Sequence, residues 1–146
     1  MSNKAKKSLI KVIGTQRYGN ERDKDKIELT TVGTFEETEN NYILRYNEEL
    51  EPPLAPIKTK LTIAKDEGKV EMLRSGSYGS CLIIERSKRN LCTYGTDYGQ
   101  ILMGIYGKSI ETDCKGDFGK FTFGYDIDVN GALTSQNEVT VEFKLN

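Results

Sequence analysis

Histidine, the side chain that most often serves as a general base, is absent from all 146 residues of this sequence. Its absence removes the Ser-His and Cys-His nucleophile systems, histidine-ligated metal sites and the commonest general base near neutral pH. Any chemistry would use carboxylates, lysine, tyrosine or cysteine, and no pair of these groups stands out by spacing. We therefore predict no catalytic residues and no cofactor, and an enzyme is the weakest of three functional hypotheses.

Arg74 is the residue whose position suggests a binding role. It follows Val70 and Met72 at every second position, so a regular strand points all three side chains to the same side. A guanidinium on the inner side of a barrel is costly unless carboxylate or carbonyl groups satisfy it. We predict that Arg74 anchors a carboxylate or phosphate ligand, with Tyr46 and Tyr125 as hydroxyl partners on inward faces. The structural alternative is that Arg74 pairs with an acidic residue of the chain or reaches water at the strand end.

The segment Asp126-Ile-Asp-Val-Asn130-Gly131 matches the first six positions of a calcium-binding loop. The twelfth position of such a loop supplies a bidentate glutamate, but here it is Asn137, and Glu138 follows one residue late. Alternating apolar and polar residues flank the segment, whereas helices flank a calcium loop. Asn-Gly is also the dipeptide that best tolerates a tight hairpin turn. We predict a hairpin turn with two outward carboxylates and no metal site.

The composition indicates a cytoplasmic protein. Cys81, Cys92 and Cys114 are an odd number of cysteines without metal-site spacing, which favours free thiols in a reducing compartment. No apolar stretch has the length of a signal-peptide core or a membrane span. A formal net charge of −1 argues against a general attraction to nucleic acid or to an anionic membrane, so we expect neither as a partner.

Strand patterns dominate the chain that must position these residues. From Phe121 to Val129 apolar residues occupy every second position, and after Asn130-Gly131 a second alternating run extends from Asn137 to Leu145. Similar runs occur upstream between turn signals, which makes about ten strand segments at a spacing of roughly 8–14 residues. The segments cover residues 8–15, 26–36, 42–47, 57–65, 70–75, 80–85, 91–94, 101–114, 121–129 and 137–145.

This spacing predicts one all-β domain over residues 1–146. Short turns between consecutive strands favour an antiparallel meander, and closure into a barrel removes exposed edges. We predict a closed antiparallel barrel of about eight to ten strands.

Glycines are expected to bend these strands. Five tyrosines directly precede a glycine, namely Tyr18, Tyr78, Tyr94, Tyr98 and Tyr106. A ring that lies over a neighbouring backbone without Cβ lets a strand bend without leaving a hole. We predict these glycines at the barrel corners, with a stacking platform for a ligand as the alternative.

The sequence also resembles a known family, the YwiB-like proteins of bacteria. The matching segments occur in order across nearly the whole chain: Thr30-Thr-Val-Gly33, Arg74-Ser-Gly76, Tyr98-Gly-Gln100, Lys108-Ser-Ile110 and Gly124-Tyr-Asp-Ile-Asp-Val129. The resemblance implies a closed calycin-like barrel akin to lipocalins and fatty-acid-binding proteins. It implies no activity and no catalytic residues, and binding of apolar ligands inside calycin barrels is an analogy from fold alone.

Two functional hypotheses stand ahead of an enzyme. In the first, the barrel binds a small, partly apolar anionic ligand that Arg74, Tyr46 and Tyr125 orient. In the second, its own side chains fill the barrel, which acts through its outer surface or as a homodimer. Residues 82–84 and 101–106 are apolar on both sides of their strands, so one side of each faces the barrel, and a loop or a second copy could cover the other.

Overall fold

Ten antiparallel strands make up the computed structural model, which describes residues 5–18, 24–49, 52–53, 55–76, 79–96 and 98–146. In chain order the strands are β1 (Lys6–Tyr18), β2 (Asp25–Glu37), β3 (Asn41–Glu48), β4 (Ile57–Ala64), β5 (Lys69–Ser75), β6 (Ser80–Glu85), β7 (Arg89–Thr96), β8 (Gly99–Cys114), β9 (Phe118–Val129) and β10 (Ala132–Leu145). Each strand pairs with its sequence neighbours, and β1 completes the ring by pairing with β10. The predicted closed meander barrel is confirmed. The described residues form no helix long and apolar enough to span a bilayer.

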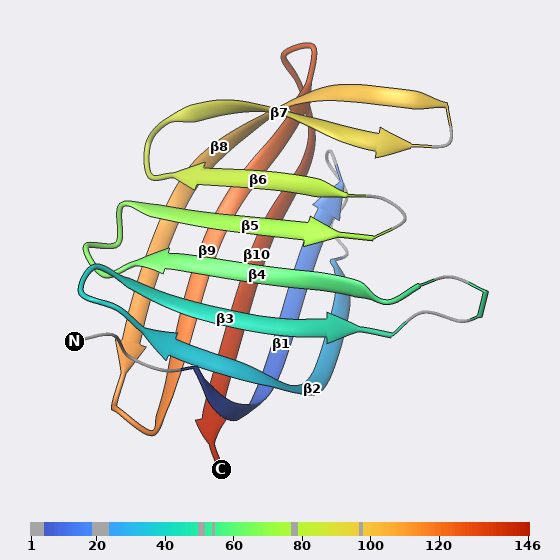
Figure 1. Cartoon of the computed structure of the whole chain (residues 1–146). Coiled ribbons are helices and arrows are strands. Elements are labelled where there is room, and N and C mark those ends of the chain that lie inside the picture. Colours follow the sequence, from blue (N-terminus) through green and yellow to red (C-terminus); the bar gives the residue numbers. More distant parts are fainter. Residues whose placement is uncertain (1–4, 19–23, 50–51, 54, 77–78, 97) are drawn as a thin grey trace.

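The barrel is flattened into two layers whose strands cross (Figure 1). β3, β4, β5 and β6 run across the front, and β8, β9, β10 and β1 run down the back. β8 joins the layers because it pairs with β7 through residues 99–106 and with β9 through residues 104–114. β2 does the same at the other side, since it pairs with β1 through residues 25–35 but with β3 only through residues 34–37. This is the geometry of orthogonally packed sheets.

Two glycines permit these corners. A Cβ atom on Gly107 would collide with the carbonyl oxygen of Glu85, and a Cβ atom on Gly33 would collide with the carbonyl oxygen of Arg45. Backbone can approach backbone so closely only where the side chain is a hydrogen atom. Gly107 follows Tyr106 and therefore belongs to the predicted set of corner glycines, whereas Gly33 does not.

Gly79 and Gly99 of the predicted set show no such collision, since a Cβ atom on Gly79 would lie 3.4 Å from the carbonyl oxygen of Arg74 and one on Gly99 would meet nothing within 4 Å. Gly99 has a φ of +113° and open space around its missing Cβ, so the hairpin between β7 and β8 requires it for its backbone angle. Gly19 and Tyr78 lie outside the described residues. A ring covers a glycine instead at Gly119, where a Cβ atom would lie 2.6 Å from Cε1 of Phe143.

Strand bounds differ from the predicted ones where the alternation is interrupted. β8 is one strand with a register shift between Gly107 and Ser109, so the face that points inward changes by one residue there. β10 begins at Ala132, before the predicted start, because a register shift between Leu133 and Ser135 disturbs its period of two. The predicted hairpin turn at Asn130-Gly131 is confirmed by positive φ angles of 54° and 83°.

Stacked aromatic rings close one end of the barrel, which carries the β2–β3, β4–β5 and β8–β9 turns and is called the closed end below. The rings of Phe35 and Phe143 stack at 3.9 Å with an interplanar angle of 10°. Phe121 extends the stack from Phe143 at 5.7 Å, and Tyr42 lies 5.2 Å from Phe121. Because these residues come from β2, β3, β9 and β10, the cluster fastens the front layer to the back layer.

The opposite end, which is called the open end below, combines buried inward residues such as Ile105 and Tyr125 with partly exposed ones. Near the closed end and the middle, inward side chains have no accessible surface: Ile10, Leu44, Leu61, Ile63, Val70, Ile84, Phe121, Phe123 and Val141. Farther along the strands, inward apolar residues are only partly buried: Val12, Leu29, Met72, Cys92 and Ile127. Ile27, the next inward position on β2, is 68% exposed. The open end therefore presents apolar surface from the inside of the barrel.

Gly107→Ala should lower the free energy of unfolding by about 1–3 kcal/mol, because the added methyl group would force backbone apart at a corner. Gly14→Ala is the matched control, since a Cβ atom at Gly14 in β1 meets nothing within 4 Å. That control should be neutral or stabilising by up to about 1 kcal/mol. Urea unfolding followed by circular dichroism measures both variants, and equal destabilisation would contradict the corner role of Gly107.

Candidate functional site

The three predicted ligand residues come from β5, β3 and β9 and meet toward the open end. Tyr46 and Tyr125 are 8% and 7% exposed, and the positive charge of Arg74 acts on both hydroxyls. The side chain of Arg74 is 29% exposed, so it lies between the buried tyrosines and water. Together with Glu48 and Thr59 these residues are called the mouth cluster.

Glu48 is the partner that Arg74 has in this structure. Nη2 of Arg74 donates a hydrogen bond to Oε2 of Glu48 at 2.9 Å, and the Glu48 side chain is 36% exposed. This is the arrangement that the structural alternative predicts. Among the described residues it is the one hydrogen bond that the guanidinium donates, out of five N–H groups. Donors therefore remain for a second anion at the same place.

The tyrosine hydroxyls of the mouth cluster are strongly held in their neutral form. Burial raises the pKa of Tyr46 to about 12, although the charge of Arg74 and a hydrogen bond with Thr59 act in the opposite direction. Burial likewise raises the pKa of Tyr125 to about 12, again against the charge of Arg74. At neutral pH both groups are therefore hydroxyl donors, which suits them to an anionic acceptor rather than to proton abstraction.

The two carboxylates of the calcium-like segment are engaged in ion pairs between strands. Nε and Nη2 of Arg89 donate to Asp128 at 2.8 and 2.6 Å, and this hydrogen bonding holds the pKa of the Asp128 carboxyl below its ordinary value. The pair crosses over Gly104, where a Cβ atom would lie 2.5 Å from Oδ2 of Asp128. Lys108 lies 3.2 Å from Oδ1 of Asp126. No group of three or more Cys, Asp or Glu residues in the described ranges is arranged to hold a metal ion.

Cys92 shows no sign of activation. All three cysteines are free thiols, and burial raises the pKa of Cys92. A raised pKa lowers the thiolate fraction at neutral pH, so Cys92 is a poor nucleophile.

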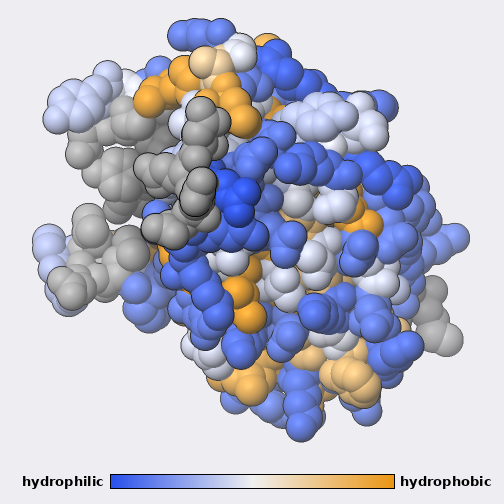
Figure 2. Space-filling model, turned by 180° about the vertical axis from the view of Figure 1, so that it is seen from behind, coloured by the Kyte–Doolittle hydropathy of each residue, from blue (hydrophilic) through white to orange (hydrophobic). Residues whose placement is uncertain are grey.

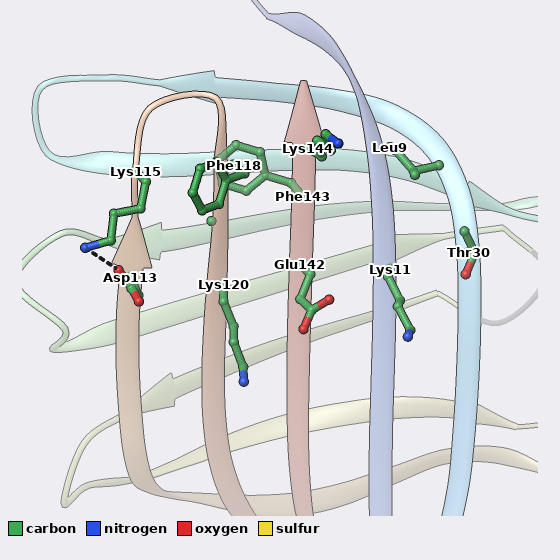
Figure 3. Close-up of a pocket in the computed structure, with 11 residues that line it drawn as sticks. Leu9, Lys11, Thr30, Asp113, Lys115, Phe118, Lys120, Glu142, Phe143 and Lys144 are labelled. Carbon is green, nitrogen blue, oxygen red and sulfur yellow. Dashed lines mark ion pairs between the residues drawn. The ribbon is translucent and has the colours of Figure 1, made fainter. Parts of the chain in front are cut away.

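A hollow of about 720 Å³ lies on the outside of the barrel, and the sequence reasoning missed it. Figure 3 shows it spread over β8, β9, β10, β1 and β2, with Leu9 and Phe118 toward the closed end. Lysines Lys11, Lys115, Lys120 and Lys144 line the rest, with Asp113 and Glu142. We call it the outer groove. The signal available in the sequence was that Leu9 and Phe118 are apolar residues at outward positions.

A second outer surface is apolar and lies over β5, β6, β7 and β8. Leu73, Leu91 and Leu102 are 50%, 60% and 53% exposed, and with Cys81 and Ile83 they form the apolar part of a hollow of about 670 Å³. Arg74 and several serine, threonine and glycine residues line the rest of it. We call this surface the apolar patch. Ile83 and Leu102 belong to the two segments predicted to be apolar on both sides. Figure 2 shows apolar surface at the top of the molecule, where β7 and the start of β8 lie in Figure 1, above a largely hydrophilic back.

The two buried tyrosines make the free energy of unfolding depend on pH in the alkaline range. Below pH 10, the ordinary value, the folded and unfolded states both hold the tyrosine protons. Between pH 10 and about 12 the unfolded state releases them first, so the free energy of unfolding should fall across this window. In Tyr46→Phe and Tyr125→Phe, urea titrations at successive pH values should show a shallower fall. Tyr106→Phe, which replaces an exposed tyrosine, is the control, and an unchanged slope in all three variants would refute the burial argument.

Comparisons with known proteins agree on the family and the fold. A family described as a domain of unknown function, DUF1934, matches residues 10–141. The chain is 25% identical over 118 residues to the uncharacterized β-barrel protein YwiB of Bacillus subtilis (strain 168). The aligned residues cover 81% of this chain and 80% of that protein.

The crystal structure of the YwiB protein from Bacillus subtilis matches this barrel with a TM-score of 0.83 at 20% sequence identity. The match covers 99% of this chain and 96% of that chain, and it establishes the shared fold. The resemblance to YwiB-like proteins noted in the sequence is confirmed. Since the family match extends over most of the residues, the chain belongs to the DUF1934 family of domains of unknown function.

Proposed function

We propose that the protein is a binding module that takes a small, partly apolar anion at the mouth cluster. The observation that carries the proposal is the inward-facing guanidinium of Arg74, which has one carboxylate partner and lies near two buried tyrosine hydroxyls. Partly buried apolar side chains such as Val12, Leu29 and Met72 adjoin this end of the interior. A cationic anchor beside apolar surface is the combination that an amphipathic anion requires.

Binding would proceed by exchange of one carboxylate for another on Arg74. Glu48 is more than one-third exposed, so its carboxylate can turn to water at small cost when a ligand carboxylate or phosphate takes its place. Tyr46 and Tyr125 would donate hydrogen bonds to the same anion because both remain neutral at physiological pH. The apolar part of the ligand would cover exposed inner surface, which contributes about 25 cal/mol per Å² removed from water.

We also propose a cell compartment, based on the state of the cysteines. Three free cysteines without a disulfide support a reducing environment, and we propose that the protein acts in the cytoplasm.

Titration with dodecanoate, with dodecanol as the uncharged counterpart, tests the mouth cluster. Arg74→Met should weaken dodecanoate binding about tenfold or more and leave dodecanol binding unchanged, because the lost group contacts only the anion. Glu48→Gln should strengthen dodecanoate binding several-fold, since it removes the internal competitor for Arg74. Lys60→Gln, on the outward side of β4, is the control for loss of a positive charge. Calorimetry measures the unmodified protein and the three variants with each ligand, and native mass spectrometry of gently purified protein reports any copurified ligand.

A purely structural Arg74–Glu48 pair gives the opposite pattern. In that case Glu48→Gln destabilises the fold without improving dodecanoate binding, and Arg74→Met affects dodecanoate and dodecanol alike. Either result rejects the mouth cluster as a ligand site.

The apolar patch favours a second candidate function, in which the barrel works as a homodimer. Three leucines at least half exposed, on β5, β7 and β8, are more than scattered surface residues, and Arg74 is the one charged residue among the described residues that line the same hollow. An apolar patch on a single face can serve as the centre of a self-complementary two-fold interface.

Sedimentation velocity at micromolar concentration tests this assembly. The unmodified protein should sediment as a dimer, and Leu91→Glu should sediment as a monomer because it places a charge in the interface. Leu133→Glu is the matched control, since Leu133 is 48% exposed on β10, outside the patch. A monomeric unmodified protein, or equal effects of the two variants, would exclude a dimer formed through the patch.

A further inference from the structure

Two rows of outward residues build the outer groove, and strand register fixes both. Lys144 of β10 is paired with Leu9 of β1 on one side and with Phe118 of β9 on the other. Two residues farther along the strands, Glu142 is paired in the same way with Lys11 and Lys120. The first row lies near the closed end and presents two exposed apolar side chains, Leu9 at 44% and Phe118 at 56%. The second row presents charges.

The lysines of the groove are largely uncompensated. Of the four that line it, Lys115 lies 3.3 Å from the Asp113 carboxylate. Lys11, Lys120 and Lys144 have no carboxylate within 4 Å in the described part of the chain. Counting four lysines against two carboxylates, the lining carries a net charge of +2, although the whole chain carries −1. The positive charge is therefore concentrated at this hollow.

We infer that the outer groove binds a small phosphate monoester that carries an aromatic or aliphatic group. A volume of about 720 Å³ suits a small organic molecule rather than a free inorganic ion. The apolar group would lie on Leu9 and the ring of Phe118, and the phosphate would lie among the ammonium groups of Lys11, Lys120 and Lys144. Lysines act as separate point charges, which favours a phosphate over the paired geometry of a carboxylate on arginine.

This site is independent of the mouth cluster. Figure 3 shows the groove side chains on the outside of β1, β9 and β10. Arg74, Tyr46 and Tyr125 are not among the residues that line the groove. The two proposals can therefore fail separately.

Backbone amide shifts of labelled protein, followed during titration with naphthyl phosphate, test the inference. Saturable shifts should map to residues 9–11, 118–120 and 142–144. Naphthol, which lacks the charge, and inorganic phosphate, which lacks the ring, should each bind at least tenfold more weakly than naphthyl phosphate. The double variant Lys11→Gln/Lys120→Gln should weaken naphthyl phosphate binding about tenfold, and Phe118→Ser should weaken it several-fold.

Two controls separate this site from general attraction and from the mouth cluster. Lys60→Gln removes a surface lysine of β4 outside the groove and should leave the affinity for naphthyl phosphate unchanged. Arg74→Met should also leave it unchanged. Shifts that map elsewhere, equal binding of inorganic phosphate, or equal loss in the double variant and Lys60→Gln would each overturn the inference.

Discussion

The stack of Phe35 on Phe143 is the contact on which the architecture depends most. It joins β2 to β10 across the barrel, and Phe121 and Tyr42 extend it to β9 and β3. Aromatic rings bury much apolar area for each residue that is ordered, so a few of them close one end of a narrow barrel. Gly119 leaves room for the ring of Phe143. The mouth cluster lies toward the other end, where Tyr46 and Tyr125 are 8% and 7% exposed.

The charged side chains of this structure differ in how fully carboxylates already pair with them. Arg89 and Asp128 form two hydrogen bonds with each other over Gly104. Arg74 has one carboxylate partner that is itself partly exposed, and three groove lysines lie beyond ion-pair distance of any described carboxylate. Exposed ion pairs contribute little to stability, so such groups are available for binding without great cost to the fold. Both proposed sites follow from this difference.

Much of the fold could be predicted because side chains of a strand alternate between the buried and the exposed face every second residue. The alternation from Phe121 to Val129 and the Asn130-Gly131 turn predicted the final hairpin correctly. The prediction failed where a single residue interrupts the period, at the register shifts in β8 and near the start of β10. It also missed Gly33 as a corner, because the atom that excludes a side chain there belongs to Arg45 on another strand.

The sequence by itself determined the strand class, the turns and the inward position of Arg74, since each depends on residues close together in the chain. Tertiary structure alone decided that Glu48, 26 residues away, is the partner of Arg74, and that Tyr46 and Tyr125 lie within reach of its charge. It also decided that Lys11, Lys120 and Lys144 share one groove. A local period specifies which face a side chain occupies, whereas strand register and ring closure specify which side chains meet on that face.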